Sequence, residues 1–232
     1  MIRRFALRFN LLLAIAALSS AGSAATGEPT DPGWIDLGSP SVWRGYRQEE
    51  FPESWSIDPQ SVITTDGQAG VDLVTRDEFG DFDLRFEWKI TPAGNSGVLY
   101  RVTEKGDATY HTGPEYQVLD NNGIVDLESR HSAGAIYGLY PPTADAANPA
   151  GEWNTARIMI SNGHVRHWVN DQLVAEATIG SDDWRSRVAE TKFAAWERFA
   201  QSPRGRIALQ QHGARVWYRG MRVLPLEAHD LR

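Results

Sequence analysis

The sequence predicts an all-β sandwich or jelly roll, and three observations support this fold class. Residues 82–90 (FDLRFEWKI) alternate apolar and polar side chains, the period-two pattern of a strand with one buried face. Similar runs recur at a spacing of about ten residues, as in sandwich domains. Turn signals such as Asn162-Gly163 separate several of them. The 232-residue chain is long enough for one such domain with a substantial core.

The remaining strands are expected on both sides of this central run. Asp66-Gly67 predicts a hairpin before it, and Asn162-Gly163 and Asn170-Asp171 predict turns of a β-meander after it. The expected strand ranges are 34–37, 41–46, 55–58, 62–65, 71–75, 98–102, 115–120, 134–140, 152–160, 164–169, 173–175, 206–210 and 216–224.

One segment departs from the β pattern and predicts a short helix near residues 182–199. Ser181 or Asp182 is suited to be its N-cap, and acidic residues occupy its first turn. Two positions for Lys192 are open. It lies on the apolar face of a helix that continues to Phe199, or in a loop after a helix that ends near Glu190.

The N-terminus has the pattern of an export signal. Basic residues precede a short apolar run from Leu11 to Leu18, and small residues follow up to Ala25. We therefore expect a signal peptide at 1–25, a Pro/Gly-rich linker at 26–33 and one domain at 34–228. The mature protein is expected to be periplasmic or secreted, and a chain without cysteine must rely on its packed core.

The charge of the chain narrows the choice of partners. The formal charge of −7 becomes −10 when the three arginines of the leader are removed. An acidic chain without basic clusters is a poor candidate for binding nucleic acid or an anionic membrane. Nine Trp, eight Phe and seven Tyr in an exported acidic protein are common among carbohydrate-active proteins, so we expect a small-molecule carbohydrate as substrate.

The strand at 115–120 carries the main candidate residues. If Tyr116 and Val118 face the core, Glu115 and Gln117 face the other way. A bulge after Gln117 would bring Asp120 to the same face. The spacing Glu-x-Gln-x-x-Asp is then similar to the carboxylate line of laminarinase-like retaining glycosidases. A solvated outer strand face is the alternative interpretation.

Neighbouring strands are expected to extend this polar face. Alternation places Arg101 and Gln210 opposite the apolar side chains of their strands, and His212 joins them if its strand continues. If the strands are adjacent, these three residues, Glu115 and Gln117 form one polar wall. An ordinary surface ion pair for Arg101 and a turn position for His212 are the competing interpretations.

Further candidates come from loops and turns. His131 could act as a base because histidine titrates near neutral pH, although loop histidines are more often solvated. Asn95 belongs to a turn that could offer an amide to sugar hydroxyls, and Tyr137 and Lys192 are candidate substrate-binding residues. The sequence has no HExxH motif and no cysteine, so no metal ligand set is assigned. It also has no nucleophile elbow and no P-loop.

Several sequence blocks, in this order, resemble the 3-keto-disaccharide hydrolase family over roughly residues 34–226. They are WKITPAGNSGVLYRV, GPEYQVLD, SAGAIYGLYPP, GEWNTARIMISNGHVRHWVN, TKF and GRIALQQHG. This resemblance implies a concanavalin A-like jelly roll of two antiparallel sheets. It also implies cleavage of glycosides that a separate dehydrogenase has already oxidised at C3 of the sugar.

The implied reaction removes the C2 proton, expels the C1 aglycone by β-elimination and then adds water. It requires a base, for which Glu115 or His131 are candidates. It also requires a positive charge close to the enediolate anion, which Arg101, Lys192 or a divalent cation of unknown identity could supply. Gln117, Gln210 and His212 would orient the sugar. No other cofactor is implied.

Two other functions stay open at this point. One is a conventional retaining glycoside hydrolase that uses Glu115 and Asp120. The other is a lectin-like module that binds carbohydrate without cleaving it. Ile124 and Gln211 depart from the family pattern, where relatives carry His and Asp. If those residues bind a metal in relatives, a metal site in this chain is in doubt.

Overall fold

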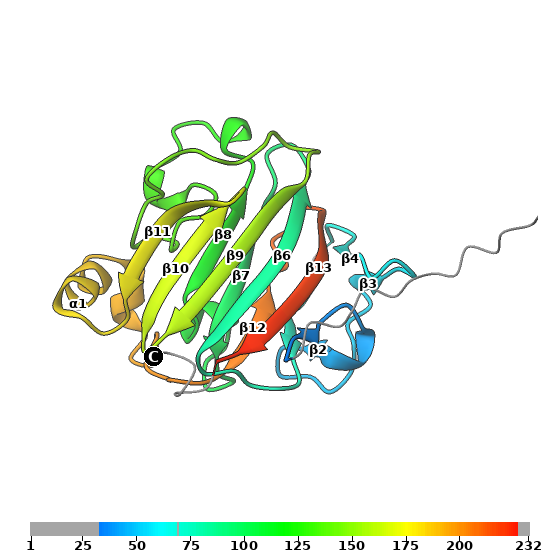
Figure 1. Cartoon of the computed structure of the whole chain (residues 1–232), viewed down its shortest axis with the longest axis horizontal. Helices are drawn as coiled ribbons and strands as arrows, with labels where there is room; N and C mark the ends of the chain where they lie inside the picture. The colour runs from blue at the N-terminus through cyan, green and yellow to red at the C-terminus, as the bar shows by residue number, and fades with distance from the viewer. Residues whose placement is uncertain (1–32, 69, 227–232) are drawn as a thin grey trace, which may run out of the picture. The chain divides into compact units, whose positions relative to one another are not determined.

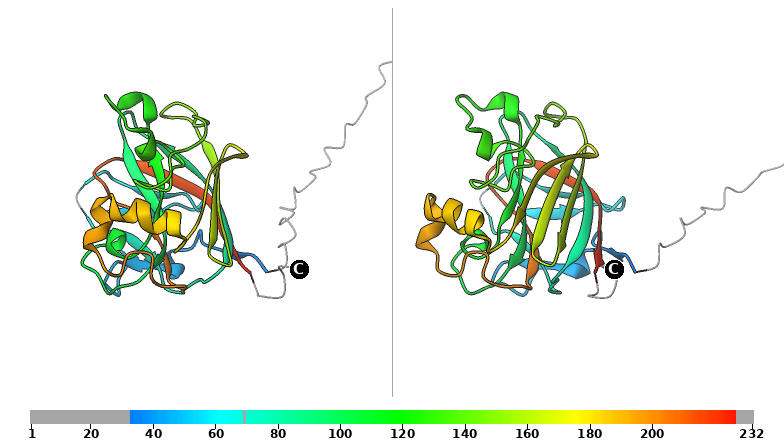
Figure 2. Two further views of the ribbon diagram at one scale, coloured as in Figure 1. Left: turned by 90° about the vertical axis from the view of Figure 1, so that its left-hand side faces the viewer. Right: turned by 60° about the vertical axis from the view of Figure 1, so that its left-hand side comes forward.

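The computed structural model describes residues 33–68 and 70–226, so the predicted leader and nearly all of the predicted linker lie outside the described residues. The described part forms two antiparallel sheets packed in layers (Figures 1 and 2). Sheet A contains β1 (Ile35–Asp36), β3 (Trp55–Ile57), β4 (Ile63–Thr65), β6 (Phe82–Ile90), β9 (Asn154–Ser161), β10 (His164–Val169), β11 (Gln172–Thr178) and β13 (Val216–Pro225). Sheet B contains β2 (Trp43–Gly45), β5 (Leu73–Thr75), β7 (Asn95–Val102), β8 (Glu115–Leu119) and β12 (Arg206–Leu209).

The strand order shows how distant segments become neighbours. Sheet A has the order β11-β10-β9-β6-β13-β4-β3, with β1 paired to β13, and sheet B has the order β2-β5-β12-β7-β8. Every strand pair is antiparallel, which confirms the predicted jelly-roll sandwich. Because β7 lies between β8 and β12, side chains from three separate parts of the chain share one face of sheet B.

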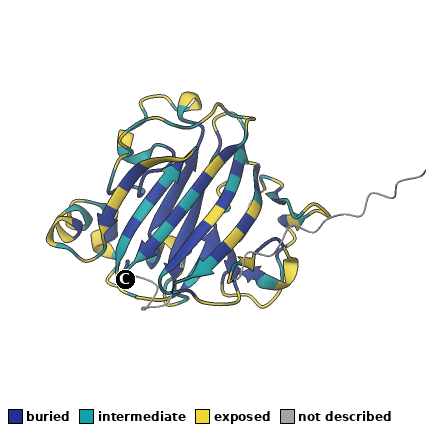
Figure 3. Cartoon of the chain, in the orientation of Figure 1, coloured by how far each residue is buried: buried dark blue, intermediate teal, exposed yellow. Residues whose placement is uncertain are grey.

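The core lies between the two sheets and follows the period-two pattern. The apolar residues of β6 are buried while Arg85 is exposed, and Figure 3 shows this alternation along the strands of sheet A. Tyr116 and Val118 of β8 are fully buried in the same core. Phe86 and Tyr116 meet across the layers edge to face, with ring centroids 5.6 Å apart. Burying these aromatic side chains supplies much of the hydrophobic stabilisation of a domain that lacks disulfides.

Helix α1 (Asp182–Ala189) confirms the predicted helical segment but is shorter than 182–199. Ser181 is its N-cap and accepts a hydrogen bond from the Trp184 amide. Lys192 lies in a separate 3-10 turn, Lys192–Ala195, as the loop alternative requires. Other 3-10 turns are Pro40–Val42, Thr109–His111, Asn121–Gly123 and Ser129–His131. No helix in the described ranges is long and apolar enough to cross a membrane.

The two Asn turns of the meander are confirmed. Asn162-Gly163 joins β9 to β10 with φ of 51° and 76°, and Asn170-Asp171 joins β10 to β11 with φ of 47° and 63°. These positive φ values at both central residues match the right-handed twist of the flanking strands.

Two other predictions about strands are wrong. Asp66-Gly67 does not form a hairpin, because β4 before it belongs to sheet A and β5 after it belongs to sheet B. Residues 134–140 do not form a strand either. They make isolated bridges from Ile136 to Tyr116 and Tyr140, since this segment folds back on itself at the edge of sheet B.

A buried hydrogen-bond chain connects the sheets beneath the polar face of sheet B. The Ser96 hydroxyl on β7 lies 2.8 Å from the Tyr218 hydroxyl on β13 and donates to the Gln210 carbonyl at 2.8 Å. Ser96 and Tyr218 are both fully buried. The bonds therefore hold the end of β12 in register with β7 and β13.

We predict that Ser96→Ala lowers the free energy of unfolding by about 1–3 kcal/mol, because it leaves a buried tyrosine hydroxyl and a carbonyl without this partner. Urea denaturation would measure the change. The matched double variant Ser96→Ala/Tyr218→Phe should lose less than the sum of the two single variants. Strictly additive losses would show that the bond between the two hydroxyls contributes nothing.

Candidate active site

A cavity of about 280 Å³ lies over the face of sheet B that is turned away from the core. We call it the Glu115 cavity. Seven of the ten predicted site residues line it, together with three aromatic residues that were not predicted. The lining residues are Asn95, Tyr110, Glu115, Gln117, Tyr137, Lys192, Phe193, Trp196, Gln210 and His212.

The floor of the cavity follows from the register of three strands. Gln117 on β8 lies opposite Gly97 on β7. The backbone N–H of Gln210, directly after β12, donates to the Gly97 carbonyl at 2.9 Å. The Glu115 side chain lies directly over Gly97, where a Cβ atom would collide with its carboxyl group. Gly97 is therefore the position that makes room for the carboxyl.

Glu115 is a buried carboxyl group with altered acidity. The residue is 6% exposed. Burial raises the pKa of its carboxyl group from 4.5 to about 8, the positive charge of Lys192 acts to lower that pKa, and the carboxylate of Asp72 acts to raise it. A carboxyl group with a pKa close to neutral pH, facing a cavity, is suited to transfer protons.

Aromatic rings and one cation cover the floor. The Lys192 Nζ lies 4.8 Å from the Tyr137 ring centroid and 5.8 Å from that of Tyr110, within cation–π distance. The Trp196 ring packs against Tyr110 and Phe193, with centroids 5.3 Å and 5.7 Å apart. These side chains come from the 3-10 turn Thr109–His111, from the turn Lys192–Ala195 with its C-cap Trp196, and from the segment around Tyr137. They explain why Glu115 is desolvated.

Asp72 positions two of the loops that border the cavity. Its carboxylate accepts a hydrogen bond from the Thr109 hydroxyl and another from the Gln211 amide at 2.8 Å. Thr109 directly precedes Tyr110 in the chain, and Gln211 directly precedes His212. The Asp72 carboxylate therefore anchors both loops, and in each loop the residue after the anchored one lines the cavity.

Gln117 and Asn95 are hydrogen-bonded to each other, and the side-chain oxygen of Gln117 is left without a partner among the described residues. Gln117 Nε2 donates to Asn95 Oδ1 at 3.0 Å, whereas the buried Gln117 Oε1 has no partner among the described residues. A buried acceptor without a partner is costly unless a ligand or water satisfies it. The donors that suit this oxygen include the hydroxyl groups of a sugar.

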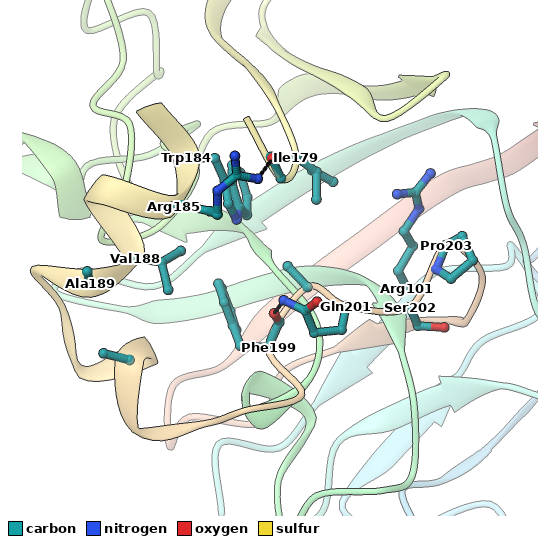
Figure 4. Close-up of a pocket in the computed structure, with 13 residues that line it drawn as sticks. Arg101, Ile179, Trp184, Arg185, Val188, Ala189, Phe199, Gln201, Ser202 and Pro203 are labelled. Carbon is teal, nitrogen blue, oxygen red and sulfur yellow. Dashed lines mark hydrogen bonds between the residues drawn. The ribbon is translucent and has the colours of Figure 1, made fainter. Parts of the chain in front are cut away.

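Arg101 does not belong to this site, so its predicted place on the polar wall is wrong. Tyr100 and Arg101 together oppose the single residue Ile207, which makes a β-bulge with Arg101 at φ 54°. The bulge reverses the alternation, and the Arg101 guanidinium instead pairs with Asp81 at 3.0 Å. It lines a different cavity, shown in Figure 4.

Asp120 is also absent from the Glu115 cavity. The pairing of β7 with β8 runs without a register shift as far as Leu119, so the expected bulge does not form. The Asp120 carboxylate instead accepts a hydrogen bond from the Ala93 amide at 2.8 Å and stabilises the turn before β7. It is not placed to act together with Glu115.

His131 lies in a neighbouring recess that shares Tyr137, Lys192 and Phe193 with the Glu115 cavity. Its ring stacks on Tyr137 with centroids 4.8 Å apart, and burial lowers its pKa below 6.5. Of the three residues predicted to be catalytic, only Glu115 therefore lines the Glu115 cavity.

Three aromatic lining residues escaped the sequence analysis. Trp196 falls within the range 182–199 that was predicted to be helical, and Phe193 belongs to the block TKF, which was quoted only for its resemblance. Tyr110 stands in a loop with no periodic pattern, so no local signal marks it. Only the packing of two loops over sheet B brings these three residues together.

The cavity contains few of the side chains that most often bind a metal ion. Glu115 and His212 are the carboxylate and imidazole groups that line it. Within residues 33–68 and 70–226, no group of three or more His, Cys, Asp and Glu side chains is arranged to hold a metal. Ile124 packs against the core, and the Gln211 side chain bonds to Thr65 and Gly213.

The jelly roll and its cavity, with a buried carboxyl group, amides and aromatic rings over one sheet, define a carbohydrate-active class of protein. The 3-keto-alpha-glucoside-1,2-lyase-like domain matches residues 34–224, and the chain belongs to this family. The resemblance noted in the sequence is confirmed. Membership identifies the chain as an enzyme that cleaves glycosidic bonds.

Individual relatives agree with this assignment. A 3-keto-disaccharide hydrolase of Bacteroides thetaiotaomicron is 32% identical over 217 residues, which cover 80% of this chain and 74% of the relative. A Parabacteroides distasonis crystal structure, provisionally named as a glycosyl hydrolase, is 30% identical with a TM-score of 0.77 and covers 84% of this chain and 94% of its own. A second structure from that organism, at 24% identity, TM-score 0.64 and coverage of 79% and 99%, shares the fold.

The acidity of Glu115 predicts a pH-dependent effect of Glu115→Gln on stability. The unfolded chain loses this proton near pH 4.5, while the folded chain keeps it until its pKa of about 8, so wild-type stability falls between these values. Glu115→Gln should match the wild type near pH 4.5 and exceed it by about 2–4 kcal/mol at pH 8.

Urea denaturation at several pH values would measure this difference. The exposed Glu53→Gln variant is the matched control and should follow the wild-type curve. A difference between Glu115→Gln and the wild type that stays constant with pH would contradict the burial of an ionisable group at this position.

Proposed function

We propose that this enzyme cleaves 3-keto-glycosides by β-elimination followed by hydration. The observation that carries the proposal is the Glu115 carboxyl group, which is buried, faces the cavity and has a pKa of about 8. The family description and the name of the Bacteroides thetaiotaomicron relative support the choice of a 3-keto substrate.

The chemistry needs few groups because the substrate is already activated. A ketone at C3 acidifies the hydrogen at C2, so a base can remove it and leave an enediolate. The C1–O bond then breaks, the electron pair goes to the leaving oxygen, and that oxygen takes up a proton. Water finally adds across the double bond, with its hydroxyl group on C1 and its hydrogen on C2.

The lining residues can supply each role. Glu115 is the base, because a carboxylate with a raised pKa accepts a proton from carbon more readily than an ordinary carboxylate. Lys192 holds positive charge over the same floor and stabilises the enediolate oxygen. His212 also lines the cavity, and its imidazole ring gives a proton to the leaving oxygen. The amides of Asn95, Gln117 and Gln210 orient the sugar.

The geometry disfavours a retaining hydrolysis mechanism. That mechanism needs two carboxyl groups separated by roughly 5–5.5 Å across the substrate. Asp120 is committed to the Ala93 amide and does not line the cavity, so Glu115 lacks this partner. Elimination needs one base, which the cavity contains.

The proposal places the enzyme after a sugar 3-dehydrogenase, because oxidation at C3 must precede elimination. The export signal proposed for residues 1–25 would put this step in the cell envelope or outside the cell. Both parts of this context are inferred from the chemistry and from the N-terminal sequence.

The decisive assay compares a 3-keto-disaccharide with its unoxidised parent. We expect release of the aglycone from the keto form alone, and incorporation of deuterium at C2 when the reaction runs in deuterium oxide. Glu115→Gln should lower the rate by roughly 100- to 10,000-fold. Release from the parent sugar, or full activity of Glu115→Gln, would refute the proposed mechanism.

Lys192→Gln should change the pH profile as well as the rate. The charge of Lys192 acts to lower the pKa of Glu115, so its removal should raise that pKa and move the ascending limb of activity to higher pH. The control is Lys89→Gln on the outer face of sheet A, where Lys89 lies over Trp153 and Trp217. A profile that Lys192→Gln leaves unmoved would argue against this coupling.

A further inference from the structure

A second cavity of about 610 Å³ lies between α1, the segment 199–203 and the end of β7. We call it the Arg101 cavity, and Figure 4 shows Arg101 and Pro203 across from Trp184 and Arg185. None of the residues that line it also lines the Glu115 cavity. The proposed reaction therefore makes no use of it.

Arg101 is a buried cation with unused hydrogen-bonding capacity. Its side chain is 7% exposed, and one of its nitrogens, Nη2, donates to Asp81 at 3.0 Å. Its Nε atom is buried and has no partner within the described residues. The other oxygen of Asp81 is taken by the Asn162 amide, so Asp81 does not satisfy the rest of the guanidinium. A buried guanidinium in this condition favours an additional acceptor.

The strained backbone at Arg101 supports this interpretation. A φ of 54° lies in the left-handed region, which is uncommon and unfavourable for a residue with a long side chain. The bulge carries the guanidinium away from the polar floor of sheet B and towards the second cavity. The chain thus maintains an unfavourable backbone conformation that directs a cation into a mainly apolar cavity.

The remaining lining defines what would fit beside this cation. The walls are mainly apolar and come from Ile179, Trp184, Val188 and Phe199. Among the described residues that line the cavity, none is Asp or Glu, although the protein as a whole carries a net charge of −7. The second cation, Arg185, lies at the rim and bonds to the Gly180 carbonyl and Asp182. The cavity therefore combines positive charge with apolar surface.

We propose that the Arg101 cavity binds a small organic carboxylate with an apolar body. A guanidinium offers a planar pair of donors that matches the two oxygens of a carboxylate. The apolar body would contact the walls formed by α1 and Phe199. A sugar ring fits less well, because Trp184 already stacks on Tyr140 and Phe199, with centroids 5.9 Å and 6.4 Å apart.

Calorimetric titration of the full chain with two matched probes tests the proposal. Phenylacetate carries the carboxylate, and 2-phenylethanol has the same ring with a neutral hydroxyl group. We expect phenylacetate to bind about ten- to a hundredfold more tightly than the alcohol, the factor expected for charged hydrogen bonds. Equal affinity for both probes, or no binding of phenylacetate at millimolar concentration, would overturn the proposal.

Variants assign the binding to this cavity. Arg101→Gln should weaken phenylacetate binding at least about tenfold, by loss of the charged hydrogen bonds. Because this change also breaks the pair with Asp81, Val188→Trp is a second variant that fills the cavity and leaves Arg101 intact. The exposed Arg198→Gln, beside Phe199, is the matched control and should bind normally. Undiminished binding by Val188→Trp would show that the probe binds elsewhere.

Discussion

The site depends on one constraint, the burial of the Glu115 carboxyl group over a glycine. Gly97 leaves the space that the carboxyl occupies, and the loops above it exclude water. Desolvation then disfavours the charged form, so the pKa of Glu115 rises to about 8 while Lys192 acts in the opposite direction. The position, the acidity and the proposed role as a base all follow from this arrangement.

The strands alone do not create that environment. The carboxylate of Asp72 holds the loops before Tyr110 and His212, and Ser96 ties β7 to β13 and to the end of β12. The segment that contains α1 and the turn Lys192–Ala195 contributes side chains to both cavities. Phe193 and Phe199 stack at 4.2 Å, with Phe193 lining the Glu115 cavity and Phe199 lining the Arg101 cavity.

Errors in the sequence analysis of the site share one physical cause. Arg101 and Asp120 were placed by counting side chains along strands, and such counting holds only while the register is regular. A bulge at Arg101 reversed the alternation, and the bulge expected before Asp120 did not form. Glu115 and Gln117 were placed correctly because β8 pairs with β7 without a register shift. Gln210 was placed correctly because it follows Leu209, where β12 pairs regularly with β7 again after the bulge. The three aromatic residues that were not predicted, Tyr110, Phe193 and Trp196, lie in loops, where side chains follow no regular alternation.

The sequence by itself determined the all-β class, most strand positions, the two meander turns and the outward direction of Glu115. These features depend on local alternation and on turn chemistry, both of which can be read along the chain. Only the tertiary structure decided that β7 lies between β8 and β12, and that two loops cover their polar face. The acidity of Glu115 arises from that cover, because desolvation depends on groups distant in sequence. The same holds for the Arg101 cavity, which exists because a bulge and a helix meet in space.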